Sequence, residues 1–152
     1  MKAQIFSLLF GLVTLAAGLA QAGETILPGS REWNEIFEPP YKEPTEVPSS
    51  SLLRKTLFDQ LRPNIVRQAG KPVRFMGSLT AFKNWALFVG RTVNESGDSI
   101  RFPPLDNDDT VALWLRTRDG WRLVDFSVGH SDAFYIIWPE QYGVPKTLLG
   151  MK

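Results

Sequence analysis

The feature that most constrains this chain is a stretch of alternating apolar and polar residues, Asp109–Gly129, interrupted by Asp119-Gly120. Alternation with a period of two is typical of a β-strand. An Asp-Gly pair suits a two-residue type I′ turn, because both central residues of that turn need positive φ. The stretch therefore predicts a β-hairpin in which Arg118 pairs with Trp121.

In that register the two faces of the hairpin differ in chemistry. The apolar face, which is expected to be core, carries Val111, Leu113, Leu115, Val124, Phe126 and Val128. The opposite face also carries Leu123, and its aromatic and charged members form a candidate binding surface: Trp114, Arg116, Arg118, Trp121 and Asp125. Tryptophan and arginine are enriched at binding hot spots. The alternative is a solvated sheet face stabilised by cation–π contacts.

The first 22 residues have the pattern of a secretory signal peptide. Lys2 gives a positive start, an apolar run follows, and Ala20-Gln21-Ala22 matches the small-x-small cleavage pattern. The apolar run is shorter than the roughly 20 residues that span a bilayer, so no membrane span is predicted. We expect cleavage after Ala22 and a periplasmic or secreted bacterial protein.

The composition excludes several function classes. Without the leader the chain has 16 basic and 16 acidic residues, since Lys2 is the leader's one charged residue, and this neutral balance argues against nucleic-acid binding. The chain has no cysteine and a single histidine, which excludes thiol catalysis and thiolate or histidine-rich metal sites. No metal and no cofactor are therefore expected. The sequence Asp106-Asn107-Asp108-Asp109 is similar to a calcium loop but lacks its glycine and distal glutamate, which favours a solvated turn.

Residues 23–50 are rich in proline and are predicted to form an extended arm, and residues 51–152 a single domain. The arm carries Trp33, Ile36 and Phe37, which either cover the domain or bind a partner. The domain begins with an amphipathic helix whose N-cap is offered by Ser49-Ser50-Ser51, and Pro63 predicts a kink or a restart near Arg62, with the C-terminal stop at Gly70.

A second hairpin is predicted from Val73–Phe82 and Trp85–Val93, joined by Lys83-Asn84. Its register places Gly77 opposite Gly90, and two opposed glycines indicate a sharp bend of the sheet or close approach of the helix. The aromatic tail, from Phe134 to Tyr142, is expected to pack on the sheet, with only the last few residues free.

This order of elements predicts an α+β fold: a curved antiparallel sheet of about four strands packed on one long N-terminal helix. The leading helix, the Asn84-Trp85-Ala86 strand start and the DGWRLVDFSVG stretch before a tryptophan-containing end resemble cystatin-like and NTF2-like domains. They also resemble small exported bacterial proteins without an assigned activity. The resemblance covers Leu52 to Tyr142 and implies the fold alone, because such folds host enzymes, inhibitors and binding modules alike.

Two hypotheses of function follow. The first is a non-catalytic exported binding module that binds a protein partner, or a second copy of itself, through the sheet face and the arm. An inhibitor or immunity-type partner of an envelope protein is one form of it. The second is a small-molecule carrier or enzyme using a cavity between helix and sheet, with His130 and Asp132 at its mouth, because an imidazole beside a carboxylate can act as a general base.

Overall fold

The computed structural model of this chain describes residues 41–131 and 134–152. Its elements, in chain order, are β1 (Tyr41–Glu46), α2 (Leu52–Ala69), β2 (Arg74–Lys83), β3 (Trp85–Val93), β4 (Asp109–Thr117), β5 (Gly120–Val128), the 3-10 helix η1 (Phe134–Ile137), α3 (Trp138–Tyr142) and the 3-10 helix η2 (Lys146–Leu149). The predicted signal peptide and most of the predicted arm lie outside the described residues.

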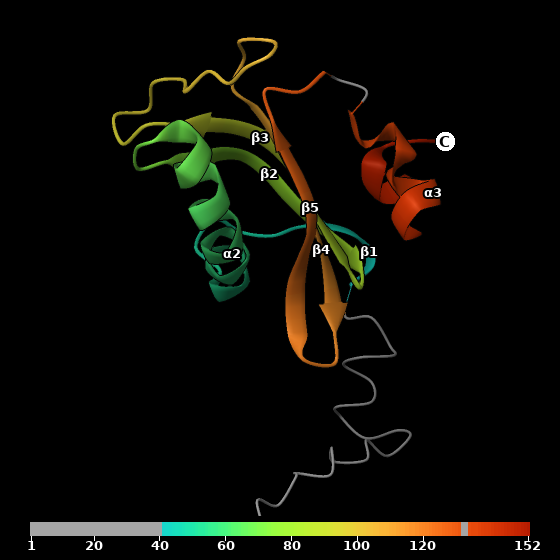
Figure 1. Cartoon of the computed structure of the whole chain (residues 1–152). Helices are drawn as coiled ribbons and strands as arrows, with labels where there is room; N and C mark the ends of the chain where they lie inside the picture. Colours follow the sequence, from blue (N-terminus) through green and yellow to red (C-terminus); the bar gives the residue numbers. More distant parts are fainter. Residues whose placement is uncertain (1–40, 132–133) are drawn as a thin grey trace, which may run out of the picture.

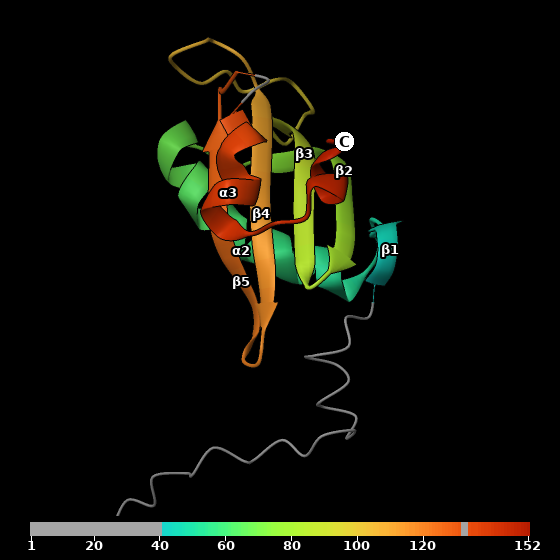
Figure 2. The ribbon, with the colours of Figure 1, turned by 90° about the vertical axis from the view of Figure 1, so that its right-hand side faces the viewer.

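The described strands form one antiparallel sheet in the order β1-β2-β3-β4-β5, so each strand pairs with its neighbour in sequence. Figure 1 shows β2 and β3 curving around α2 on one side of the sheet, with α3 on the other side. The view turned by 90° shows α3 in front of β4 and α2 behind the sheet (Figure 2). Both faces of the sheet are therefore covered in its central part.

The predicted fold class is wrong in two respects. The sheet has five strands instead of about four, and the long helix follows the first strand instead of standing at the N-terminus. The additional strand, β1, comes from the proline-rich segment that was predicted to be an arm. An edge strand tolerates Pro44 because one row of its backbone groups pairs with no strand, and the pairing with β2 is irregular between Tyr41 and Thr45.

The ends of α2 follow the sequence prediction. Ser51 Oγ accepts a hydrogen bond of 3.1 Å from the backbone N–H of Arg54, and Gly70 ends the helix with a φ of 67°. Of the predicted kink or restart near Arg62, the restart is wrong, because the helix continues through Pro63. Leu57, Leu61 and Ile65 are fully buried on one stripe, so packing on the sheet holds the helix together across the lost backbone hydrogen bond.

The β2–β3 hairpin has the predicted register, with Phe82 opposite Trp85 and Gly77 opposite Gly90. A Cβ atom on Gly77 would lie 2.4 Å from the carbonyl oxygen of Val89, and one on Gly90 would lie 2.2 Å from that of Met76. No side chain fits at these distances. The two glycines are therefore required for the close approach of β2 and β3. Figure 1 shows that this hairpin curves around α2.

The predicted register of the β4–β5 hairpin is wrong. Arg116 pairs with Trp121 and Thr117 with Gly120, so the turn residues are Arg118 and Asp119. The Thr117 hydroxyl closes this turn by donating a hydrogen bond of 2.9 Å to the carbonyl of Gly120. A bulge on β5 then changes the offset by one residue between the Leu113 and Trp114 pairs.

Two apolar clusters lie on opposite faces of the sheet. The cluster beneath α2 includes Trp114, Phe88 and Phe58, and the cluster beneath the C-terminal elements includes Val111, Leu113 and Trp138. Tyr135 and Tyr142 pack on the second cluster as predicted, but other residues of the tail are exposed: Phe134, Ile136 and Ile137. The packing continues into η2, where Leu148 and Leu149 are buried.

Candidate functional site

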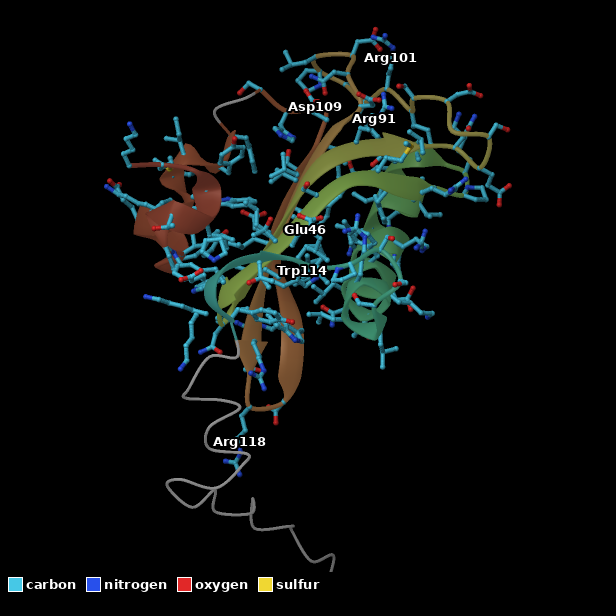
Figure 3. All side chains as sticks on the ribbon, turned by 180° about the vertical axis from the view of Figure 1, so that it is seen from behind. Glu46, Arg91, Arg101, Asp109, Trp114 and Arg118 are labelled. Carbon is cyan, nitrogen blue, oxygen red and sulfur yellow. The ribbon has the colours of Figure 1, made fainter. Side chains whose placement is uncertain are left out.

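The residues of the predicted hairpin surface do not lie on one surface. Trp114 is fully buried under α2 (0% exposed), and Trp121 is half-buried against the same cluster. Arg118 stands at the tip of the hairpin, away from the body of the domain, whereas Trp114 lies deep inside (Figure 3). Arg116 is half-buried and pairs with Trp121. The hairpin therefore places Trp114 in the core and Arg118 at its tip, so these two residues do not share a surface.

Asp125 lies at the β5 bulge and binds the C-terminal elements. Its Oδ2 accepts hydrogen bonds from Trp138 Nε1 at 3.2 Å and from the Tyr142 hydroxyl at 2.9 Å. Its Oδ1 accepts a hydrogen bond of 2.8 Å from the backbone N–H of Phe126. The hydrogen bond to Asp125 raises the pKa of Tyr142, with burial of the phenol as the next cause. Asp125 thus joins the sheet to the tail.

His130 follows β5 and is half-buried. Its carbonyl accepts a hydrogen bond of 3.2 Å from Asn107 Nδ2, and its ring centroid lies 5.7 Å from that of Phe134. Asp132, its predicted partner, lies outside the described residues. In the loop before β4, the Ser99 hydroxyl donates a hydrogen bond to Asp108 Oδ2, and Arg101 Nη1 lies 3.7 Å from Asp106 Oδ2. Within residues 41–131 and 134–152, no three acidic or histidine side chains gather closely enough to hold a metal ion.

The described residues do form a groove, between α2 and the start of β2. It has a volume of about 320 Å³ and is lined by Ser49, Arg54, Lys55, Phe58, Arg62, Arg74 and Phe75. Four of these seven side chains are basic and two are aromatic. We call this site the basic groove.

Arg54 forms the inner wall of the basic groove and is only 9% exposed. Its Nη2 donates to the carbonyl of Gly77 at 2.7 Å and its Nη1 to that of Val47 at 3.2 Å. The Glu46 carboxylate lies 3.8 Å away and accepts a further hydrogen bond from the backbone N–H of Leu79. Arg54 therefore connects the segment before α2 to the bend of β2, and its charge is partly balanced.

Arg62 and Arg74 are more open to solvent. Arg62 Nη1 donates to the carbonyl of Val73 at 2.7 Å, and Arg74 Nη1 donates to that of Glu95 at 3.2 Å. Among the described residues, each guanidinium group is thus positioned by a hydrogen bond to a backbone carbonyl, and the charge of Arg62 also helps to lower the pKa of Asp59. A guanidinium group has five N–H donors in a planar fork, so both arginines retain donors for a ligand.

Lys55 lies at the rim, where it donates a hydrogen bond to Asp59, four residues further along α2. This hydrogen bond lowers the pKa of Asp59. Residues 49–75 carry one acidic side chain, Asp59, against six basic ones: Arg54, Lys55, Arg62, Arg67, Lys71 and Arg74. The segment is therefore strongly positive, although the whole chain is nearly neutral.

This arrangement can bind a negatively charged group. Arginine forks match carboxylate and phosphate in geometry, and such charge-assisted hydrogen bonds are stronger than neutral ones. The described lining offers one hydroxyl group, that of Ser49, and no carboxylate or imidazole that could act as a general base.

The sequence analysis missed the basic groove. Its lining comes from two elements, because Arg54 and Arg62 lie in α2 and Arg74 begins β2, and the pattern of neither element indicated a shared site. The signal in the sequence was a local excess of positive charge, which the nearly neutral net charge of the whole chain does not show. Charge counted by segment would have indicated a positive region at residues 49–75, although not the groove itself.

Comparisons with known proteins do not identify the chain: no family model, no curated protein and no solved structure matches it. The resemblance to cystatin-like and NTF2-like domains therefore stays a prediction. In the described part of the chain, none of the helices has the length and apolar character needed to span a membrane.

Proposed function

We propose that this protein is a non-catalytic binding domain that holds an anionic group of its ligand in the basic groove. The observation that carries the proposal is that Arg62 of α2 and Arg74 of β2 line the same groove. Both guanidinium groups are oriented by backbone carbonyls, so little side-chain freedom is lost when a ligand binds.

The predicted signal peptide gives this proposal its setting. A periplasmic or secreted binding domain meets envelope components, and a protein partner with an exposed carboxylate or phosphate group is one possible ligand. The inhibitor or immunity-type role is the form of the proposal in which that partner is an envelope protein. The carrier hypothesis is the form in which the ligand is a small molecule. Its proposed binding site is now the basic groove instead of a cavity beside His130.

The test is a titration of the purified protein with inorganic phosphate, followed by the backbone amide signals in NMR spectra. We expect saturable shifts at Arg62, Arg74 and their neighbours. Replacing both arginines by glutamine removes two charge-assisted contacts, each worth about 1.5–3 kcal/mol, so the affinity falls by at least about a hundredfold.

A matched control separates the groove from the overall charge. The double variant Arg67→Gln with Lys71→Gln also removes two positive charges. Both residues are exposed, and neither lines the groove. The control variant is expected to keep most of the affinity for phosphate. Equal losses in the two double variants would mean that phosphate responds only to net charge, and the proposal would fail.

A further inference from the structure

The floor of the basic groove is aromatic. The ring centroids of Phe58 and Phe75 are 5.0 Å apart, with the ring planes at 45°. Arg54 stands over Phe58 at 5.0 Å and Arg62 over Phe75 at 5.4 Å, so cations and rings alternate along the lining. A site for a bare inorganic anion needs positive donors and gains nothing from such a floor.

Building on the proposed function, we infer that the ligand is an amphiphilic acid: a carboxylate or phosphate group attached to one aromatic ring or an apolar group of that size. Its acidic end would contact Arg62 and Arg74, and its ring would lie against Phe75. Phe75 is half-buried, so part of its ring remains available. Phe58, at 7% exposed, supports it from beneath.

The size of the groove agrees with this class of ligand. Its volume of about 320 Å³ lies at the lower end of the range for ligand sites, which is roughly 300–1,000 Å³. One substituted ring with its acid group fills such a space, whereas a dinucleotide or a large cofactor does not.

The experiment compares ligands that share the acid and differ in the ring. Phenyl phosphate is measured against inorganic phosphate, and phenylacetate against acetate, by titration of the purified protein. Burial of about 60 Å² of ring surface predicts affinities about tenfold higher for the two aromatic acids. Whichever of phenyl phosphate and phenylacetate binds with the higher affinity identifies the preferred anion, phosphate or carboxylate.

The variant Phe75→Leu keeps the floor apolar and removes the ring. We expect it to weaken phenyl phosphate about threefold or more and to leave inorganic phosphate unchanged, because ring–ring contact adds about 0.5–1.5 kcal/mol. The matched control is Phe134→Leu, a phenylalanine of the C-terminal region that is 37% exposed and does not line the groove. Its affinities should equal those of the natural protein.

The outcomes separate the two proposals. If phenyl phosphate and inorganic phosphate bind equally well at the groove, the inference about the ring is wrong and the proposed anion site stands. If no anion perturbs the groove residues, both proposals fail. If Phe75→Leu weakens inorganic phosphate as much as phenyl phosphate, the ring serves the structure of the groove and the inference is again wrong.

Discussion

Trp138 Nε1 donates a hydrogen bond of 3.2 Å to Asp125 Oδ2, which connects α3 to the bulge of β5. Trp114, on the other face of the sheet, is equally buried, at 0% exposed, but its Nε1 has no hydrogen-bond partner among the residues that the structure describes. The two indoles are therefore a natural pair of probes, because they share burial and differ in their polar contact.

We expect Trp138→Phe to destabilise the protein more than Trp114→Phe does. Both changes remove buried volume, but only Trp138→Phe breaks a hydrogen bond to a carboxylate, which adds about 1.5–3 kcal/mol to its cost. Urea unfolding followed by circular dichroism measures the two losses. Equal losses would show that the bond to Asp125 contributes nothing to stability.

Gln60 protects the outer edge of the sheet. Its Nε2 donates to the carbonyl of Trp121 at 2.8 Å, and its Oε1 accepts from the backbone N–H of Leu123 at 3.0 Å, as a neighbouring strand would. We expect Gln60→Ala to cost about 1–3 kcal/mol for two lost hydrogen bonds. It should also promote self-association through the uncovered edge, measured by analytical ultracentrifugation.

The control for Gln60 is Gln68→Ala, an exposed glutamine of the same helix. This variant should keep the stability and the oligomeric state of the natural protein. If Gln60→Ala behaves like Gln68→Ala in both measurements, the side chain of Gln60 does not protect β5.

Gly90 is expected to tolerate no side chain. A Cβ atom there would lie 2.2 Å from the Met76 carbonyl oxygen, so Gly90→Ala forces the two strands apart at about 1–3 kcal/mol or more. The neighbouring exposed position provides the comparison, because Ser78→Ala should leave the midpoint of urea unfolding nearly unchanged. A Gly90→Ala protein as stable as Ser78→Ala would contradict the observed closeness of β2 and β3.

Tyr142 should titrate above the ordinary tyrosine pKa, because its hydroxyl donates to Asp125. A raised pKa means that the folded state binds the phenol proton more tightly than the unfolded state does. The stability this adds is present below pH 10.0, the ordinary value, and is lost as the pH rises through the folded value.

The measurement is ultraviolet absorbance of the phenolate in a protein with Tyr41→Phe and Tyr135→Phe, which leaves Tyr142 as the one tyrosine of the three. Adding Asp125→Asn should move the titration toward lower pH. No movement would mean that Asp125 is not the cause of the shift.

Part of the fold could be predicted from local signals. Ser51 and Gly70 bound the helix because capping depends on neighbouring residues, and the β2–β3 register follows from its two-residue turn and the pairing of Gly77 with Gly90. The edge strand β1 could not be predicted, since Pro44 argues against a strand and only pairing with β2 outweighs that preference.

The basic groove illustrates the same limit. Its arginines were visible in the sequence, but their meeting depends on the curvature that brings the start of β2 beside α2 (Figure 1). A local sequence pattern does not predict the distance between a helix and the strand that follows it, because that distance depends on the curvature of the whole sheet.

The sequence by itself determined the alternation of β4, the ends of α2 and the apolar character of the tail. The tertiary structure decided which face of the sheet is core, because both faces are covered. Trp114 faces α2 and Leu113 faces Trp138, so alternation could not identify a solvent side. A period of two separates the faces of a strand, but only the elements packed on each face determine which residues water reaches.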